Sequence, residues 1–313
     1  MNIGLDMMGG DFSPLEAVRG VQLYLKAAPA PVTLFLVGDE TKIDPLLKEY
    51  QVPEASVKVI HAPQVIEMNE HPTKALKEKQ QSSISVGFHL LATGKMDAFI
   101  SAGNTGAMLV GALYSLKPIE GIQRPTISTI LPKTNGGTGV LLDVGLNADC
   151  KPENLNQFAI LGSLYAKHIL GIEEPKVGLL NIGEEEGKGN ILAQAAYPLL
   201  KDNSQIRFIG NVEGRDLLQD KADVIVCEGF TGNVILKMAE SLFDITREKQ
   251  IKSEYFDQFD FELYGGTPLL GVTKPVIIGH GISHGKAFLN MILLAQKMLE
   301  SDLLGKMKES FHS

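Results

Sequence analysis

Residues 97–110 read Asp97-Ala-Phe-Ile-Ser-Ala-Gly-Asn-Thr-Gly-Ala-Met-Leu-Val110 and predict a strand, a glycine turn and the start of a helix. The short apolar run ends at two glycines three residues apart, and Asn104 and Thr105 are residue types that cap a helix. Successive backbone N–H groups in such a turn, together with the helix dipole, can bind a phosphate or carboxylate without any charged side chain. The stretch is therefore a candidate anion-binding loop.

The same pattern returns 126 residues later as Asp223-Val-Ile-Val-Cys-Glu-Gly-Phe-Thr-Gly-Asn-Val-Ile-Leu236. Asp, Gly, Thr and Gly coincide in register, which indicates a pseudo-repeat. Two such units would place two glycine loops at the carboxyl ends of parallel strands, where open α/β sheets bind ligands. The alternative is that a doubly wound protein contains several strand–glycine–helix turns without any common role.

The composition is that of an ordinary globular protein. With 313 residues, of which 44% are apolar, the chain can hold one large α/β domain or two smaller ones. The net charge is -8 and the basic residues are scattered, so the sequence makes no case for a nucleic-acid partner. Neither cysteine lies in a CxxC pair, so we predict no disulfide framework and no zinc site. We also expect no other metal and no cofactor. The first strand begins at Asn2 without a signal peptide, and no apolar run approaches the roughly 20 residues that span a bilayer, so a cytoplasmic location is expected.

Strands and helices are predicted to alternate along the whole chain. We therefore expect an α/β fold: a three-layer α/β/α, Rossmann-like domain over residues 1–313, with two lobes, a mostly parallel sheet and a peripheral helical segment at 238–262. The turn at Thr134–Gly137 predicts a hairpin of residues 126–131 and 138–142. Residues 264–271 are expected to form a glycine loop, a helix to continue through Lys252, and residues 285–307 to form one terminal amphipathic helix.

Several polar residues beside glycines have both a functional and a structural interpretation. Asp6 and Asp11 flank the glycine turn of residues 7–11 and serve either a ligand or the turn itself. Lys188 lies between two glycines after a predicted strand, which favours a cation that faces a ligand over a solvated surface residue. Cys227 lies on a predicted strand without an activating base, which favours a buried thiol over a nucleophile.

Three common enzyme patterns are absent. The loop Gly-Asn-Thr-Gly-Ala-Met lacks the Lys-Ser/Thr ending of a P-loop, and no strand is followed by GxGxxG or by a GxSxG elbow. What remains is an α/β protein with many uncharged glycine, asparagine and threonine junctions at strand ends, which suits inorganic phosphate or a phosphorylated ligand.

From end to end the chain resembles the bacterial phosphate acyltransferases, which convert acyl-acyl-carrier-protein and orthophosphate into acyl phosphate and free carrier protein. The matching segments are Asp6–Asp11, Ser101–Gly106, Arg124-Pro125, Asp143-x-Gly-x-Asn147, Leu180–Gly183, Lys188–Asn190, Gly210–Glu213, Gly229–Asn233, Tyr264-Gly-Gly and His280-Gly281. The resemblance implies an isocitrate-dehydrogenase-like, phosphotransacetylase-like fold. It also implies a homodimer that works at the membrane surface and supplies a membrane glycerol-3-phosphate acyltransferase in phospholipid synthesis.

The resemblance also implies roles for individual residues. Lys188 and Asn233 are the predicted catalytic residues, which would stabilise the oxyanion or the phosphate. The positions predicted to bind phosphate or substrate are Asp6, Gly9, Gly10, Asp11, Gly103, Asn104, Thr105, Gly106, Asn147, Asn181, Gly183, Asn190, Gly229, Thr231, Gly232 and His280. The chain departs from the family pattern at Ile282 and in a shorter segment between Lys237 and Tyr264, which is mixed in charge.

Two other functions remain open on the sequence alone. A metal- and NAD-dependent decarboxylating dehydrogenase of related architecture would need clustered Asp ligands and a Lys–Tyr pair, for which Asp143 and Asp149 offer little. A non-catalytic sensor of phosphate or carrier protein would use the same glycine loops for binding.

Overall fold

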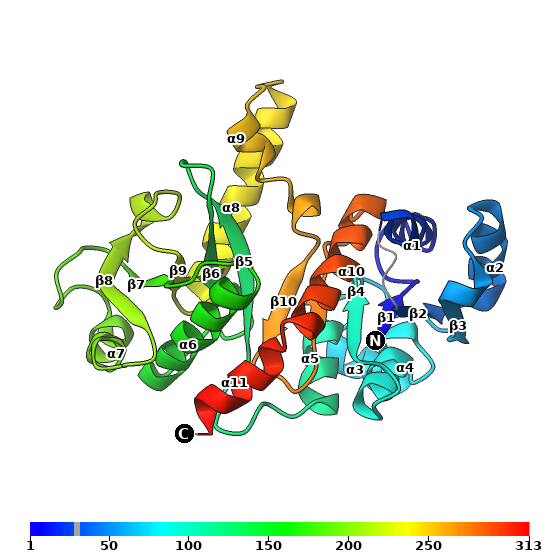
Figure 1. Ribbon diagram of the computed structural model, residues 1–313, viewed down its shortest axis with the longest axis horizontal. Helices are drawn as coiled ribbons and strands as arrows, with labels where there is room; N and C mark the ends of the chain where they lie inside the picture. Colours follow the sequence, from blue (N-terminus) through cyan, green and yellow to red (C-terminus); the bar gives the residue numbers. More distant parts are fainter. Residues whose placement is uncertain (28–31, 313) are drawn as a thin grey trace. The chain divides into compact units, whose positions relative to one another are not determined.

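A computed structural model of the protein describes residues 1–27 and 32–312, and these residues form two compact units. The first unit consists of Met1–Lys117 and Phe261–Glu300, and the second of Pro118–Asp260 and Ser301–Ser313. Each unit is therefore made of two separate stretches of the chain, and the chain passes from one unit to the other three times. Both units have the α/β architecture that the sequence predicts (Figure 1).

The first unit is built on six strands in the order β3-β2-β1-β4-β11-β10. They are β1 (Asn2–Asp6), β2 (Thr33–Gly38), β3 (Val57–His61), β4 (Ala98–Ser101), β10 (Thr267–Leu270) and β11 (Val276–Ile278). All neighbours pair in parallel except β10, which runs antiparallel to β11. Because the parallel strands end at one edge, the loops after β1, β4 and β11 are brought together there.

Helices cover both faces of this sheet (Figure 1). They are α1 (Leu15–Ala27), α2 (Glu40–Glu49), α3 (Pro72–Glu78), α4 (Ser83–Ala92), α5 (Thr105–Ser115) and α10 (Gly285–Glu300), with short 3₁₀ turns η1 (Glu54–Ser56) and η3 (Phe261–Leu263). Helices α1 and α10 pack closely because Gly20 lies against Phe288, where any side chain would collide. On α4, Gly87 leaves the space that the Phe99 ring of β4 fills.

The second unit is built on five strands in the order β5-β6-β9-β7-β8. They are β5 (Thr126–Pro132), β6 (Thr138–Leu142), β7 (Lys176–Asn181), β8 (Arg207–Glu213) and β9 (Val224–Val226). The β5–β6 pair is the antiparallel hairpin predicted from its turn, and the other pairs are parallel. The helices are α6 (Pro152–His168), α7 (Ile191–Lys201), α8 (Gly229–Glu248), α9 (Glu254–Asp257) and α11 (Leu303–Phe311), with the 3₁₀ turn η2 (Gly214–Asp216).

The pseudo-repeat is present in the structure, one copy in each unit. Before β4, the Asp97 carboxylate accepts a 2.8 Å hydrogen bond from the backbone N–H of Asn2, which opens the neighbouring strand β1. Before β9, the Asp223 carboxylate accepts a 2.8 Å hydrogen bond from the N–H of Lys176, which opens the neighbouring strand β7. Both aspartates therefore fix the register of two adjacent parallel strands, and a helix follows each strand.

Three predicted elements are wrong in detail. Residues 264–271 contain a strand, β10, rather than a loop alone. The predicted terminal helix of residues 285–307 is two helices, because Asp302 adopts a left-handed conformation with φ of 50° and ends the helical path. Helix α8 ends at Glu248 rather than continuing through Lys252, and the short α9 follows it. Together α8 and α9 extend beyond the strands of the second unit (Figure 1).

A search of the described residues for membrane-spanning helices finds none with the length and apolarity required.

Candidate active site

Asp6 ends β1 and holds the loop that follows. Its carboxylate is fully buried, accepts a 2.9 Å hydrogen bond from the N–H of Met8, and accepts a 2.6 Å bond from the hydroxyl of Ser101 at the end of β4. The same hydroxyl accepts from the N–H of Gly103 at 2.9 Å. Burial raises the pKa of Asp6 above its ordinary value, although the hydrogen bonds from Ser101 and its neighbours oppose this shift. The side chain thus ties together the glycine loops after β1 and β4.

The glycines of these loops allow close approach of backbone to backbone. A Cβ at Gly9 would lie 2.6 Å from the nitrogen of Gly103, and a Cβ at Gly10, whose φ is +100°, would lie 3.0 Å from the carbonyl oxygen of Gly281. The N–H of Asp11 donates to that same carbonyl at 2.7 Å. The loops after β1, β4 and β11 therefore touch, and the structure brings the predicted positions of the first unit together. His280 lies in the third loop, with its ring 4.6 Å from that of Phe261.

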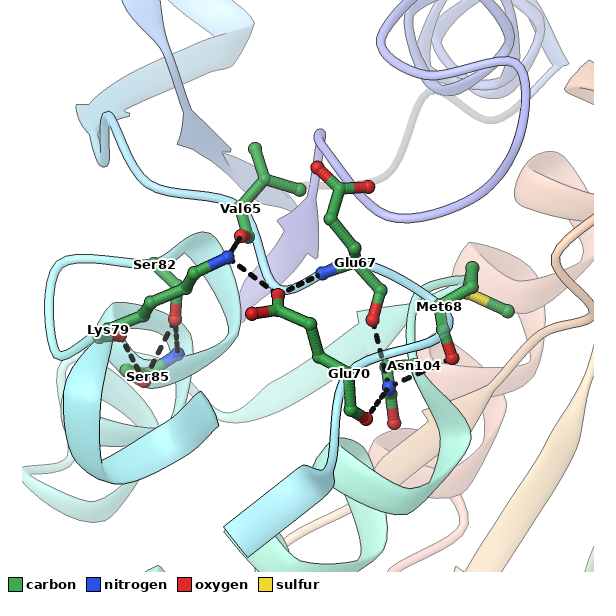
Figure 2. Close-up of polar contacts among 8 residues, drawn as sticks. All are labelled: Val65, Glu67, Met68, Glu70, Lys79, Ser82, Ser85 and Asn104. Atoms are coloured by element: carbon green, nitrogen blue, oxygen red, sulfur yellow. Dashed lines mark hydrogen bonds and ion pairs between the residues drawn. The ribbon is translucent and has the colours of Figure 1, made fainter. Parts of the chain in front are cut away.

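Asn104 is the N-cap of α5, as its place before the predicted helix indicates. Its side-chain oxygen accepts from the N–H of Ala107 at 2.9 Å. Its side-chain nitrogen points at three backbone carbonyls of one loop, those of Glu67, Met68 and Glu70, at 3.0, 3.2 and 3.0 Å (Figure 2). The whole side-chain amide is therefore engaged within the protein, and Asn104 positions the loop of residues 62–71 against the glycine turn.

A second set of contacts fixes the other side of this loop (Figure 2). The Glu70 carboxylate accepts from the N–H of Glu67 at 2.7 Å and from the ammonium of Lys79 at 2.6 Å, and Lys79 also donates to the carbonyl of Val65. These bonds lower the pKa of Glu70, the bond from Lys79 first. The first backbone N–H groups of α5, at Thr105 and Gly106, have no acceptor among the described residues. They are the part of this turn that can receive an anion.

In the second unit the loop after β6 closes around its own aspartate. The buried carboxylate of Asp143 accepts from the N–H groups of Gly145 at 3.2 Å, Leu146 at 3.2 Å and Asn147 at 2.7 Å, and from the side-chain amide of Asn147 at 2.7 Å. Burial raises the pKa of this carboxyl, against the opposing effect of Asn147. An internal carboxylate thus occupies the cluster of N–H donors that an external anion would use.

Helix α8 begins beside this loop. The N–H of Gly229 donates to the carbonyl of Asn147 at 2.7 Å, and a Cβ at Gly232 would collide with the carbonyl oxygen of Asp143. The side-chain nitrogen of Asn233 donates to the carbonyl of Val144 at 3.1 Å. Asn147, Gly229, Gly232 and Asn233 are therefore brought together, as the prediction of a shared site requires.

The two copies of the repeat differ in their caps. Helix α5 is capped by Asn104, after the first glycine, whereas α8 is capped by Glu228, before it. The Glu228 carboxylate accepts from the N–H of Thr231 at 2.7 Å and from its hydroxyl. The acid therefore occupies the N–H group and the hydroxyl of Thr231, a residue predicted from the sequence to bind phosphate or substrate. Glu228 is a functional cap that the glycine pattern does not predict, although an acid three residues before Thr231 is a recognisable capping signal.

The Lys188 loop lies at the end of β7. The side-chain nitrogen of Asn181 donates to the carbonyl of Lys188 at 3.0 Å, and Gly189 adopts φ of +95° against the Asn181 amide. The Lys188 side chain runs over Gly183 and is exposed, with no carboxylate in ion-pair distance within the part of the chain that the structure describes. Asn190 caps α7 by accepting from the N–H of Ala193 at 2.8 Å. The loop is thus shaped by Asn181 and Asn190, and its cation is left available.

Cys227 is a buried thiol, as predicted. It is 5% exposed, and burial raises its pKa well above the ordinary value. The nearby negative charges of Glu228 and Asp143 raise the pKa further. The neighbouring Cys150 has its pKa raised to about 11, mainly by burial. Neither thiol has the lowered pKa of an activated nucleophile.

One cluster of carboxylates was not foreseen. Ligand atoms of Glu184, Glu213 and Asp216 lie within 4.8 Å of one another. The ammonium of Lys221 bonds to Glu184 at 2.5 Å and to Asp216 at 2.7 Å, and Arg215 pairs with Glu213. These two cations offset the negative charge of the cluster.

Comparison with known proteins adds to this geometry. The family model described as fatty acid synthesis protein matches residues 1–306. A phosphate acyltransferase of Dictyoglomus turgidum is 44% identical, with all of this chain and 98% of that protein covered, and one of Desulfitobacterium hafniense strain DCB-2 is 45% identical, with 99% and 97% covered. Among solved structures, a phosphotransacetylase of Streptococcus pyogenes matches with a TM-score of 0.67 at 19% identity, over 96% of this chain and 94% of that one. A branched-chain phosphotransacylase of Enterococcus faecalis matches with a TM-score of 0.64 at 17% identity, over 95% and 99%. These structural matches establish the shared fold.

Proposed function

The chain belongs to the fatty acid synthesis protein family, whose curated members include phosphate acyltransferases, and from that membership we propose that it transfers an acyl group from acyl-acyl-carrier-protein to orthophosphate. The products are acyl phosphate and free carrier protein, and the reaction is reversible. The observation that carries the proposal is that the likeness to phosphate acyltransferases extends over the whole chain.

The reaction makes modest demands on the protein. A phosphate oxygen attacks the thioester carbonyl carbon, and the bond from that carbon to sulfur breaks as the pantetheine thiolate leaves. Orthophosphate is already an anion at neutral pH. The pantetheine thiol has a pKa of about 8.5, so its thiolate can leave without being protonated first. Positioning and stabilisation of the tetrahedral oxyanion are therefore the main contributions, and one well-placed donor of this kind is worth about 3 kcal/mol.

Lys188 and Asn233 are the donors that we propose. The exposed Lys188 ammonium has no ion-pair partner in the described chain, so its charge is available to a substrate. The Asn233 side chain donates one hydrogen bond, to Val144, while a side-chain amide has a second N–H to offer. Both side chains thus have the free donor capacity that the role demands.

Phosphate binding is proposed at the loops of Gly9–Gly10 and Gly103–Gly106. The free N–H groups of Thr105 and Gly106 at the start of α5 support this, because they combine with the helix dipole. The loop of Gly229–Gly232 is a weaker phosphate ligand as it stands, since the carboxylate of Glu228 already accepts from Thr231. In that loop Asn233 would be the group that reaches the substrate.

The exposed face of α8 supports the proposed homodimer. Phe230, Val234, Met238, Leu242 and Ile245 recur every three or four residues and are 68, 55, 64, 40 and 49% exposed. Such spacing places them on one side of the helix, and an apolar stripe of this length is unusual on a surface that meets only water. By the family likeness we propose a cytoplasmic homodimer that contacts the membrane surface and passes acyl phosphate to a membrane glycerol-3-phosphate acyltransferase for phospholipid synthesis.

The test is a direct assay of the reaction. Purified protein is incubated with palmitoyl-acyl-carrier-protein, with and without orthophosphate, while free carrier thiol is followed and acyl phosphate is trapped as its hydroxamate. Parallel reactions with palmitoyl-CoA show whether the carrier protein is required. We expect thiol release that depends on phosphate and is matched by hydroxamate. If the carrier protein or phosphate binds without any release, the protein is a sensor and the proposal is wrong.

A further inference from the structure

The second unit contains a hollow of about 580 Å³, and its lining includes three of the predicted phosphate- or substrate-binding residues, Asn181, Asn190 and Thr231. Its floor and walls come from the end of β7, the loop and first turn of α7, the first two turns of α8, one residue each of α6 and η2, and Cys227 after β9. The side chains that give it an apolar lining are Leu155, Leu179, Leu180, Leu192, Ala193 and Ile235. We propose that this hollow, named here the β7–α8 pocket, holds the alkyl chain of the substrate's acyl group, which deepens and rests on the proposed function.

The polar side chains around the β7–α8 pocket make hydrogen bonds within the protein. Asn181 donates to the carbonyl of Lys188 and accepts from the N–H of Ile182, and Asn190 accepts from the N–H of Ala193. Thr231 and Glu228 bond to each other. These bonds use part of the donor and acceptor capacity of the lining, and the lining is otherwise largely apolar, which favours an apolar occupant.

Charge excludes an anion from this pocket. The lining has no lysine, arginine or histidine, and its one carboxylate is that of Glu228. A phosphate placed there would meet a like charge without a compensating cation. An uncharged alkyl chain is not repelled by the Glu228 carboxylate. The pocket therefore suits the acyl group of the reaction rather than the phosphate.

The pocket adjoins the loop that carries one proposed donor. Asn181 lines it and also bonds to the backbone of Lys188. On α8, Thr231 and Ile235 line the pocket, whereas Asn233 lies on the opposite side of the helix and donates to Val144. A chain that lies in the pocket therefore has one end beside the Lys188 loop. The rim is apolar as well, because Ile182 lines the pocket and yet is 81% exposed. An exposed isoleucine at that position gives the chain an apolar path from solvent.

The pocket should make binding depend on chain length. Each additional methylene that is buried improves affinity about fourfold, until the chain fills the space. The wild-type protein should therefore prefer long acyl chains over short ones. Filling the pocket with a side chain should remove that preference without removing the reaction.

Ala193 is the position at which to fill it. Ala193 is 8% exposed and lines the pocket, whereas Ala195, two residues later on α7, faces solvent. Ala193→Phe adds an aromatic ring inside the pocket, and Ala195→Phe adds the same ring to the same helix outside it. Far-UV circular dichroism and thermal unfolding of both variants show whether each one is folded.

Two readouts are compared in the three proteins. The first is binding of the fluorescent long-chain fatty acid cis-parinaric acid and its displacement by palmitic and octanoic acids. The second is the KM for palmitoyl- and octanoyl-carrier protein. We expect Ala193→Phe to weaken binding of the long chain at least tenfold and to raise the KM for the palmitoyl substrate but not the octanoyl one, and Ala195→Phe to behave as wild type. Unchanged binding and unchanged chain-length preference in a folded Ala193→Phe protein overturn the inference.

A labelling experiment on the wild-type protein covers the case in which Ala193→Phe does not fold. A palmitic acid with a diazirine at its terminal carbon is bound, illuminated and located by mass spectrometry. Labels on α7 or on α8 near Ile235 support the pocket, and labels confined to other segments contradict it. The pocket and the proposed function can fail separately. If the acyl chain binds in the pocket but no acyl phosphate forms, the pocket is supported and the proposed function is wrong. If acyl phosphate forms but no chain binds in the pocket, the proposed function is supported and the pocket proposal is wrong.

Discussion

Asn147 donates twice to one oxygen of Asp143, from its backbone N–H and from its side-chain amide, each at 2.7 Å. The same side chain donates to the carbonyl of Pro125 at 2.8 Å. A buried carboxylate is thereby held by an asparagine four residues away, and the loop after β6 takes its shape from this pair. The sequence motif Asp-x-Gly-x-Asn is thus explained by an internal contact, whatever further role it has with substrate.

Asn147→Ala removes both side-chain hydrogen bonds and leaves the Asp143 carboxylate with fewer donors. We expect the free energy of unfolding to fall by about 1–3 kcal/mol, because an underbonded polar group remains buried. Urea denaturation measures the change. Gln205→Ala removes an amide from an exposed position and serves as the control. Equal stability of the two variants would show that the Asp143–Asn147 pair does not hold the loop.

Asp6→Asn should change how stability depends on pH. Burial raises the pKa of Asp6 above its ordinary value of 3.8, so the folded protein retains this proton at pH values where the unfolded chain has lost it. The contribution of Asp6 to stability is present below that value and is lost as the pH rises through the folded pKa. Asparagine does not ionise, so Asp6→Asn does not lose stability through deprotonation at this position. The stability of the variant relative to wild type should therefore increase as the pH rises. Urea denaturation from about pH 4 to pH 8 measures the difference, and Asp44→Asn makes the same chemical change at an exposed position. If the difference in unfolding free energy between Asp6→Asn and wild type stays constant over this pH range, the pKa of Asp6 is not raised in the folded protein.

Gly232→Ala tests the contact between α8 and the Asp143 loop. The added methyl group would collide with the carbonyl oxygen of Asp143, and both backbones are fixed by other hydrogen bonds. We expect destabilisation of about 1–3 kcal/mol and displacement of the neighbouring Asn233. Gly187→Ala is the matched control, because a Cβ at Gly187 meets open space. Thermal and urea unfolding compare the two, and indistinguishable variants would mean that the helix can shift freely.

Lys188→Ala and Asn233→Ala should each lower kcat about 10²-fold or more, with the fold intact, if they stabilise the oxyanion. Lys201→Ala removes a lysine from the surface of the same unit and is the control. Hydroxamate formation from palmitoyl-acyl-carrier-protein measures turnover. Near-normal turnover in both site variants would falsify the catalytic assignment, whereas a raised KM for phosphate alone would assign them to phosphate binding.

Met238→Glu places a charge in the middle of the apolar stripe of α8. We expect it to convert a dimer into a monomer, as measured by sedimentation equilibrium, because a desolvated carboxylate without a partner opposes association. Gln250→Glu adds the same charge just beyond the helix and should leave the dimer intact. Liposome flotation of both variants separates membrane contact from self-association. A dimer that persists in Met238→Glu would place the subunit interface elsewhere.

Most secondary structure was predictable because its signals are local. The turn at Thr134–Gly137 specified the hairpin of β5 and β6, and Asn104 specified the start of α5. Strand β10 was missed because its four residues lie between glycines and include a proline. The break at Asp302 was missed because the apolar periodicity of α10 continues into α11, and a left-handed residue leaves no mark on that periodicity.

The glycines of the candidate site were predictable from the sequence, and the contacts of its polar side chains were less so. The glycines were found because close backbone contacts require them, as at Gly9 against Gly103. The partners of the polar side chains were not predictable, because they come from remote segments. Asn104 donates to the carbonyls of Glu67, Met68 and Glu70, and Asp6 accepts from Ser101. Whether these positions also bind phosphate stays a prediction.

The sequence by itself determined the α/β class, the repeated strand–glycine–helix unit and the family, because periodicity, caps and ordered motifs are properties of short stretches. Only the tertiary structure decided which N–H groups stay free for an anion. At the end of β6 and the start of α8 the carboxylates of Asp143 and Glu228 occupy them, while Thr105 and Gly106 keep theirs available. It also formed the β7–α8 pocket, because α6, β7, α7 and α8 must pack together before their apolar side chains enclose a space.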